Sequence, residues 1–167
     1  MPAPFSVFTT ASVMSGTVDH PVILYAGSSE INAALRMPRN ERLSRWLGTS
    51  DSPINATIYV GAVGRAAVIN RRPIEVVVDA EPAITHMGMA GPRSQVTVNI
   101  VFTSGLEVRG YLHLSQRADW RAIITPSDGS WRALTGATVS YDGILLRAGA
   151  DAIVNLCAVA RVELCEE

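Results

Sequence analysis

The residues with the clearest capacity for binding chemistry are arginines that lie close together: Arg36, Arg39, Arg42 and Arg45. Guanidinium groups bind carboxylates and phosphates through paired hydrogen bonds, so such a cluster could hold a small anionic ligand such as a nucleotide. The same spacing is typical of a short helix whose face is turned to solvent or to a partner. We favour the second interpretation and keep Arg36, Arg42 and Arg45 as candidate binding residues.

Binding of a cyclic dinucleotide would require a second element beside these arginines. PilZ-type binders use a loop with the pattern D/N-x-S-x-x-G. The nearest stretch here, NATIYVG at 55–61, is one residue too long for that pattern. We therefore do not predict a cyclic-dinucleotide site.

Two asparagines and a tryptophan complete the candidate binding residues. Asn70 and Asn155 each precede a predicted strand at matching places in the chain. Such an asparagine either bonds its own backbone in a turn or contacts a ligand. Trp131 either fills the core or anchors a partner at the surface. The sequence leaves both alternatives open.

No group of residues predicts catalysis, a metal site or a cofactor. The three histidines, His20, His86 and His113, have no second histidine or acid at ligand spacing, and His113 should point to solvent from a strand. The stretch SDGS at 127–130 has the composition of a turn and lacks a nucleophile elbow. The runs GAVG at 61–64 and GMAG at 88–91 are too short to cradle a phosphate. We predict that the protein is not an enzyme.

The composition predicts an ordered chain that associates with itself. Of 167 residues, 48% are hydrophobic and 17% are charged, so apolar surface should remain to be covered by another subunit. All 14 basic residues are arginine, which suits protein interfaces. The net charge of -1 without a basic run makes nucleic acid an unexpected partner. Cys157 and Cys165 should be free thiols with a packing role.

The amino terminus lacks the basic and apolar regions of an export signal, and no run is long enough for a membrane helix. We therefore expect a cytoplasmic protein with no membrane partner.

The strongest structural pattern is a β-hairpin at 95–114. Apolar and polar residues alternate on both sides of Ser104-Gly105, which is typical of a hairpin with a glycine-bearing turn. A weaker copy of this pattern at 22–37 is followed by a predicted helix with Asn40 as its N-cap, Leu43, Trp46 and Leu47 on one face, and Gly48 at its end. The further predicted strands are 6–13, 54–60, 66–70, 74–79, 133–141, 144–147 and a last run at 152–164, with a second helix at 118–124.

These elements repeat in the same order, which predicts a tandem duplication. Apolar residues of the strand and helix at Ile31, Leu35, Met37, Leu43, Trp46 and Leu47 match Val108, Leu112, Leu114, Trp120, Ile123 and Ile124 at one constant spacing. We divide the chain into an N-terminal segment (1–20), a first β unit (21–80), a linker (81–94) and a second β unit (95–167).

The repeated unit resembles an uncharacterised small bacterial β-domain family in tandem duplication. The residues that carry this resemblance lie at 43–47, 108–114, 137–139 and 155–162. The hairpin at 98–110 is also similar to the first motif of Sm-like small barrels. The resemblance implies barrel geometry but no RNA role, because the last strands lack the Arg-Gly pair of such proteins.

The sequence therefore predicts a mostly β protein of two tandem small β-barrel or sandwich-like units, each with one short helix. The leading functional hypothesis is a non-enzymatic structural or interaction module that forms homo-oligomers and could also bind another protein. One alternative is a small-ligand or nucleotide-binding regulator. Another is an enzyme whose residues come from both units.

Overall fold

The protein is mostly β in its computed structural model, which describes residues 16–80, 94–115, 118–125 and 131–165. The first half (16–80) contains β1 (Thr17–Ala26), β2 (Ser29–Pro38), α2 (Leu43–Leu47), β3 (Ile54–Val60), β4 (Val63–Ile69) and β5 (Val76–Asp79). The second half (94–165) contains β6 (Ser94–Phe102), β7 (Leu106–Leu114), α3 (Trp120–Ile124), β8 (Trp131–Tyr141), β9 (Ile144–Asn155), the 3₁₀ turn η2 (Leu156–Ala158) and β10 (Val159–Leu164). The strand predicted at 6–13, His86, and the stretches 88–91 and 127–130 lie outside the described residues.

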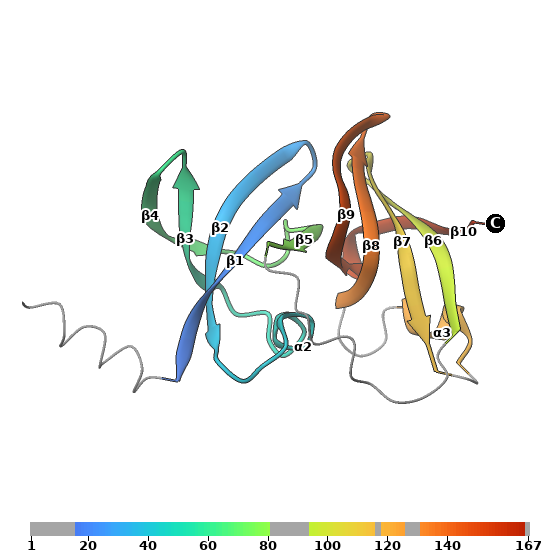
Figure 1. The fold of residues 1–167 in the computed structure, drawn as a ribbon, viewed down its shortest axis with the longest axis horizontal. Coiled ribbons are helices and arrows are strands. Elements are labelled where there is room, and N and C mark those ends of the chain that lie inside the picture. Colours follow the sequence, from blue (N-terminus) through green and yellow to red (C-terminus); the bar gives the residue numbers. More distant parts are fainter. Residues whose placement is uncertain (1–15, 81–93, 116–117, 126–130, 166–167) are drawn as a thin grey trace, which may run out of the picture.

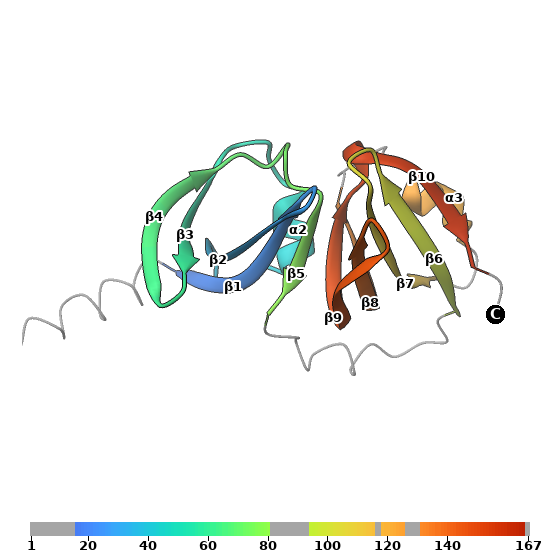
Figure 2. The same cartoon turned by 90° about the horizontal axis from the view of Figure 1, so that it is seen from above.

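The strands form one open antiparallel sheet of ten strands, in the order β10-β6-β7-β8-β9-β5-β1-β2-β3-β4 (Figure 1). Within each half the strand order is the same, because β5-β1-β2-β3-β4 corresponds place by place to β10-β6-β7-β8-β9. The halves meet where β5 pairs with β9, and the strands of each half are strongly curved (Figure 2). Among the described strands the sheet is not closed, since β10 and β4 are its end strands.

The pairing of β5 with β9, which we call the seam, separates two hydrophobic cores. Its register places Val76 opposite Val154, Val77 opposite Ile153 and Val78 opposite Ala152. Successive side chains of a strand point to opposite faces. Val77 and Ile153 accordingly pack in the core of the first half, while the four flanking residues pack in the core of the second half.

The seam strands β5 and β9 and the neighbouring β1 are buried on both faces over part of their length, which explains their sequences there. Residues 22–25 of β1 and 76–78 of β5 are buried without interruption, and so are 152–155 of β9. A strand covered on both faces needs apolar residues at every position, so its sequence does not alternate. The edge strands lack such runs.

Each core contains side chains from both halves. Ile23, Tyr25, Val76 and Val78 of the first half pack into the core of the second half. In the opposite direction, Trp131 of β8 packs into the core of the first half, where α2 contacts β8. The two halves therefore stabilise one another through side chains as well as through the seam.

Several predicted elements are confirmed. The hairpin predicted at 95–114 is β6 and β7, with its turn at Gly105, whose φ of 93° suits glycine. The strand predicted at 54–60 is β3, and the predicted helix face is correct, because Leu43 and Leu47 of α2 are buried. His113 is exposed, as expected, and its ring bonds the Thr135 hydroxyl.

Some boundaries were predicted wrongly because tertiary contacts decide them. Asn40 is not the N-cap of α2. The amide of Arg39 bonds the Gly16 carbonyl and that of Glu41 bonds Pro38, so residues 39–41 form a turn and Arg42 occupies the cap position. β1 begins at Thr17, inside the predicted N-terminal segment, because it pairs with β2 along its whole length.

The bounds of β4, β5 and β9 also differ from prediction. β4 begins at Val63, three residues before the predicted start, because it pairs with β3 up to the Gly61 turn. β5 begins at Val76 and not at residue 74. β9 runs unbroken from Ile144 to Asn155, and its irregular pairing with β8 accommodates Gly149 in a positive-φ conformation.

The cysteines were partly mispredicted. Both are free thiols, but Cys157 is exposed and Cys165 is half-buried, so neither fills the core. Among the residues that the structure describes, none of the helices is both long and apolar enough to cross a membrane.

Candidate functional site

Arg42, Arg45 and Trp131 lie together in a groove of about 800 Å³ between α2 and the start of β8. Arg132 of β8 lines the same groove. The sequence predicted Arg42 and Arg45 as parts of one arginine cluster and Trp131 separately. The fold brings Trp131 to the two arginines because β8 of the second half packs against α2 of the first half. A groove lined by guanidinium groups can bind carboxylate or phosphate groups.

A buried arginine holds α2 in place beside this groove. The Arg71 guanidinium donates from Nη1 to the carbonyls of Trp46 (3.0 Å) and Leu47 (2.6 Å), and from Nε to the carbonyl of Ser52 (2.8 Å). It also lies over the Trp46 ring, 5.0 Å from the ring centre. Burial lowers the pKa of Arg71 below its usual value, although a guanidinium stays protonated in proteins. Arg71 therefore supplies hydrogen bonds to helix carbonyls that lack an intrahelical partner.

Arg132 has a corresponding structural role in the second half. Its Nε donates to the Ile123 carbonyl near the end of α3 (2.7 Å), and its Nη1 donates to the Trp131 carbonyl (2.9 Å). The Arg132 side chain is thus oriented by backbone carbonyls at the wall of the groove. Arg42 and Arg45, in contrast, are exposed on α2.

Trp131 is a core residue. It is 6% exposed and packs among the core residues of the first half, so little of its surface reaches the groove. The sequence left open whether Trp131 fills the core or anchors a partner at the surface. In the structure it fills the core.

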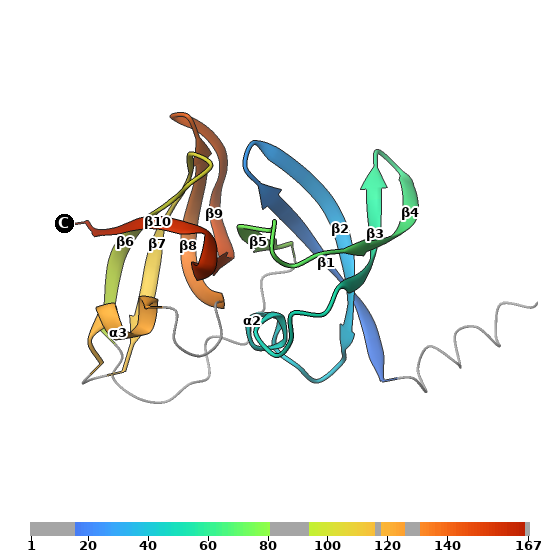
Figure 3. The ribbon, with the colours of Figure 1, turned by 180° about the vertical axis from the view of Figure 1, so that it is seen from behind.

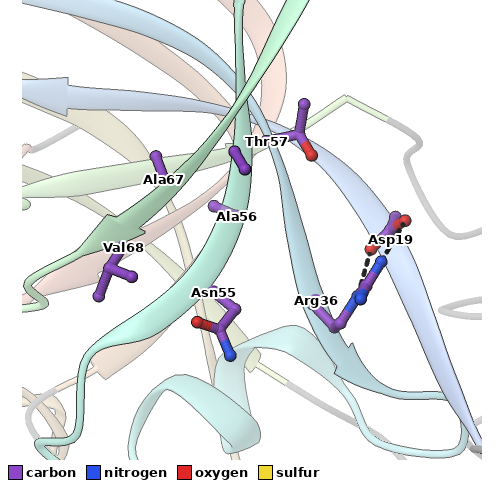
Figure 4. A pocket seen from close by; sticks show the side chains of 8 residues that line it. Asp19, Arg36, Asn55, Ala56, Thr57, Ala67 and Val68 are labelled. Atoms are coloured by element: carbon purple, nitrogen blue, oxygen red, sulfur yellow. Dashed lines mark hydrogen bonds and ion pairs between the residues drawn. The ribbon is translucent and has the colours of Figure 1, made fainter.

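Arg36 lies elsewhere, in a second groove on the outer face of the first half. This groove, of about 410 Å³, is lined by β1 to β4, and Figure 4 shows Arg36 pointing at Asp19. The two form a pair of hydrogen bonds, 3.0 Å from Nε and 3.3 Å from Nη2, and these raise the pKa of Arg36. Its charge is already matched by Asp19, so Arg36 does not act with Arg42 and Arg45.

The two asparagines have different environments. Asn155 is 4% exposed at the seam, where its Nδ2 donates to the Ile74 carbonyl (3.0 Å) and its Oδ1 accepts from the Cys157 amide (3.1 Å). Asn70 is exposed, just beyond β4. Asn155 thus has the turn role that the sequence offered as one alternative, and it also links the two halves.

Glu75 is a polar residue at the seam that sequence reasoning missed. Its buried carboxylate accepts a 2.7 Å hydrogen bond from the Ser104 hydroxyl and a 3.4 Å hydrogen bond from the Gly27 amide. It therefore joins the β1–β2 turn to the β6–β7 turn, which belong to different halves. The signal in the sequence was a single acidic residue directly before the apolar run of β5. In the fold, the Ser104 hydroxyl of the other half stabilises the carboxylate of this residue.

Polar groups elsewhere suggest structural roles. His20 was predicted in a loop but lies in β1, with Nε2 2.9 Å from Asp79 Oδ1. Tyr25, Glu30 and Arg147 form a cluster across the seam, with 2.8 Å between the tyrosine hydroxyl and Glu30 Oε2. Within the described ranges, no three histidine, cysteine, aspartate or glutamate side chains gather where they could hold a metal.

Comparisons of this chain with protein-family models, with curated proteins and with solved structures found no match.

Proposed function

We propose that this protein is a non-enzymatic structural or interaction module that self-assembles into homo-oligomers. The observation that carries the proposal is the exposure of large apolar side chains at the β3–β4 and β8–β9 hairpins: Tyr59, Val60, Val63, Val68, Ile144 and Leu145. Val60, at 69% exposure, and Ile144, at 66%, flank the two turns. Apolar surface of this kind is stabilised when another protein surface covers it.

The arrangement of the sheet supports a repeated unit. We propose that the two halves are tandem copies of one small β unit, as the shared strand order suggests. In this proposal the first copy covers the core of the second through the seam. The first copy has no equivalent cover on β4 among the described strands, so a further subunit would complete the arrangement.

Size-exclusion chromatography with light scattering tests the proposed function. We expect the full chain at micromolar concentration to elute as an assembly with at least twice the 17.9 kDa mass of one chain. Dilution should shift it toward smaller species. A mass of 17.9 kDa throughout that range would contradict the proposal.

A second candidate function, binding of a small anionic ligand, is favoured by the groove of Arg42, Arg45 and Arg132. A ligand that binds the native state alone raises the melting temperature. Thermal-shift measurements with ATP and with inorganic phosphate test this directly. The double substitution Arg42→Gln and Arg45→Gln should abolish any shift. The double substitution Arg109→Gln and Arg161→Gln, at exposed arginines of β7 and β10, serves as a charge-matched control. Equal shifts in both variants would place the ligand elsewhere.

A further inference from the structure

The two end strands of the sheet differ in how they are protected. β4 pairs with β3 over all seven of its residues, and its other edge faces outward at one end of the molecule (Figure 1). Arg65 is its single charged residue, and Val68 is 68% exposed. An edge strand of this kind offers its backbone amides and carbonyls to any strand that can pair with it.

β10 carries the charges that β4 lacks. Arg161 and Glu163 are exposed on this strand and pair with one another at 3.0 Å. Across the sheet from β10, Glu163 lies opposite Asn99 of β6, and Asn99 lies opposite Arg109 of β7. Figure 3 shows β10 at the end of the sheet opposite to β4. Charged side chains on an edge strand discourage pairing with another chain, so this end is protected.

The molecule itself shows that a strand in the position of β4 can be covered by another paired strand. β9 has the same place in the second half, and its outer edge is paired with β5 through three apolar residue pairs. The residues of β9 at this pairing are buried, whereas Ala67 and Ile69 of β4 are half-buried. The core of the first half is thus partly open at the edge where the core of the second half is covered.

We propose that β4 pairs antiparallel with β4 of a second copy of this chain, around a two-fold axis that passes beside Ala66. This rests on the proposed self-association and identifies its contact. The product is one continuous sheet with ten strands from each copy. Because a two-fold contact uses the same surface on both subunits, it closes at two copies, and the charged β10 strands remain at the outer ends.

The sequence of β4 suits this register. Ala66 lies opposite Ala66 of the other copy, Arg65 lies opposite Ala67, and Val63 lies opposite Ile69. The two Arg65 side chains therefore do not lie directly opposite one another. Directly opposed like charges would destabilise the strand pair. β10 corresponds to β5, the strand that covers β9, but pairing β4 with β10 of a second copy would bring the charged Arg161 and Glu163 to the largely apolar β4.

A charge exchange at the two-fold axis tests the contact. Ala66 is exposed on an edge strand, so Ala66→Lys and Ala66→Glu should each leave the fold intact, as circular dichroism can verify. Each variant alone would place two like charges directly opposite one another, and we expect its dimer to weaken about tenfold or more. A mixture of the two variants should form a dimer again. Ala160→Lys, on exposed β10, is the matched control and should dimerise like the parent chain.

The outcomes separate this contact from self-association in general. If both Ala66 variants assemble like the parent chain, or if Ala160→Lys alone dissociates it, the β4 contact is wrong while self-association stands. If the parent chain is a monomer, the proposed function fails and the contact fails with it. Dissociation of each Ala66 variant with recovery in the mixture supports the two-fold contact.

Discussion

β4 and β9 occupy the same place in the strand order of the two halves, but their surroundings differ. The outer edge of β9 is paired with β5, and the residues at that pairing are buried. The outer edge of β4 is an end of the sheet, and its residues are exposed or half-buried. The difference shows that a strand at this position can be a buried central strand. The first half covers the outer edge of β9, but no described strand of the second half covers the outer edge of β4.

The exchange of side chains between cores partly compensates for this asymmetry. The second half receives the apolar face of β1 and β5, whereas the first half receives Trp131 and Ile153. Trp131 enters beside α2, which lies at the end of the first half away from the β3–β4 turn (Figure 1). The first half is therefore closed by one large side chain near its helix and left open along β4.

Replacing that side chain should produce the largest effect. Trp131→Ala removes a side chain that is 6% exposed and leaves a cavity between the halves. We expect the free energy of unfolding to fall by about 3–5 kcal/mol, as for other large-to-small core substitutions. Urea denaturation followed by circular dichroism measures the loss.

The matched control is Trp120→Ala on α3, where the ring is half-buried and packs against the core of its own half. A smaller loss is expected there. If Trp131→Ala lowered the free energy of unfolding by less than the Trp120 variant, the first half would not depend on the second for its core.

The two asparagines sharpen the comparison of β4 and β9. Asn155 is the last residue of β9, and Asn70 directly follows β4. Asn155→Ala removes a buried donor to Ile74 and the acceptor for the Cys157 amide. We expect a loss of about 1–3 kcal/mol, since the Ile74 carbonyl is left without this hydrogen bond. Asn70→Ala, at an exposed position, should change stability by less than about 0.5 kcal/mol. Urea denaturation measures both losses. Equal losses in the two variants would mean that the hydrogen bonds of Asn155 at the seam add no stability beyond that of an exposed asparagine.

Local pattern predicted those elements whose stability is local. The β6–β7 hairpin and β3 were predicted with small errors because alternation and glycine turns are properties of adjacent residues. The face of each seam strand could not be predicted, because a run such as that of 76–78 is apolar at every position. Nothing near β5 or β9 in the sequence indicates that they pair, since that contact joins segments far apart in the chain.

The candidate site was predictable in part for the same reason. Arg42, Arg45 and Trp131 were identified by residue type, but their shared groove depends on packing between the halves. Arg71 and Arg72 are adjacent and of one type, yet Arg71 is buried against helix carbonyls and Arg72 is exposed. A sequence pattern does not separate two such neighbours. The backbone carbonyls that select Arg71 come from α2 and from the loop before β3.

The smallest expected effect concerns the pH dependence of the seam. Tyr25 is 0% exposed, and its hydroxyl lies between Glu30 and Arg147, which belong to different halves. Burial raises the pKa of this hydroxyl above its usual value of 10.0, opposed in part by the hydrogen bond from Arg147. The folded protein therefore holds the Tyr25 proton at pH values where the unfolded chain has released it.

This contribution to stability is fully present below pH 10 and is lost as the pH rises through the higher pKa of the folded state. Tyr25→Phe keeps the ring in the core but has no proton to release. The free energy of unfolding should consequently fall less steeply above pH 10 in the variant than in the parent chain, as urea denaturation at pH 8 and pH 10.5 can measure. Tyr59→Phe, at an exposed tyrosine, should follow the parent chain at both values. Parallel curves for all three proteins would show that the Tyr25 hydroxyl is not held differently in the folded and unfolded states, and the seam would then be stabilised by its apolar pairs and its other hydrogen bonds.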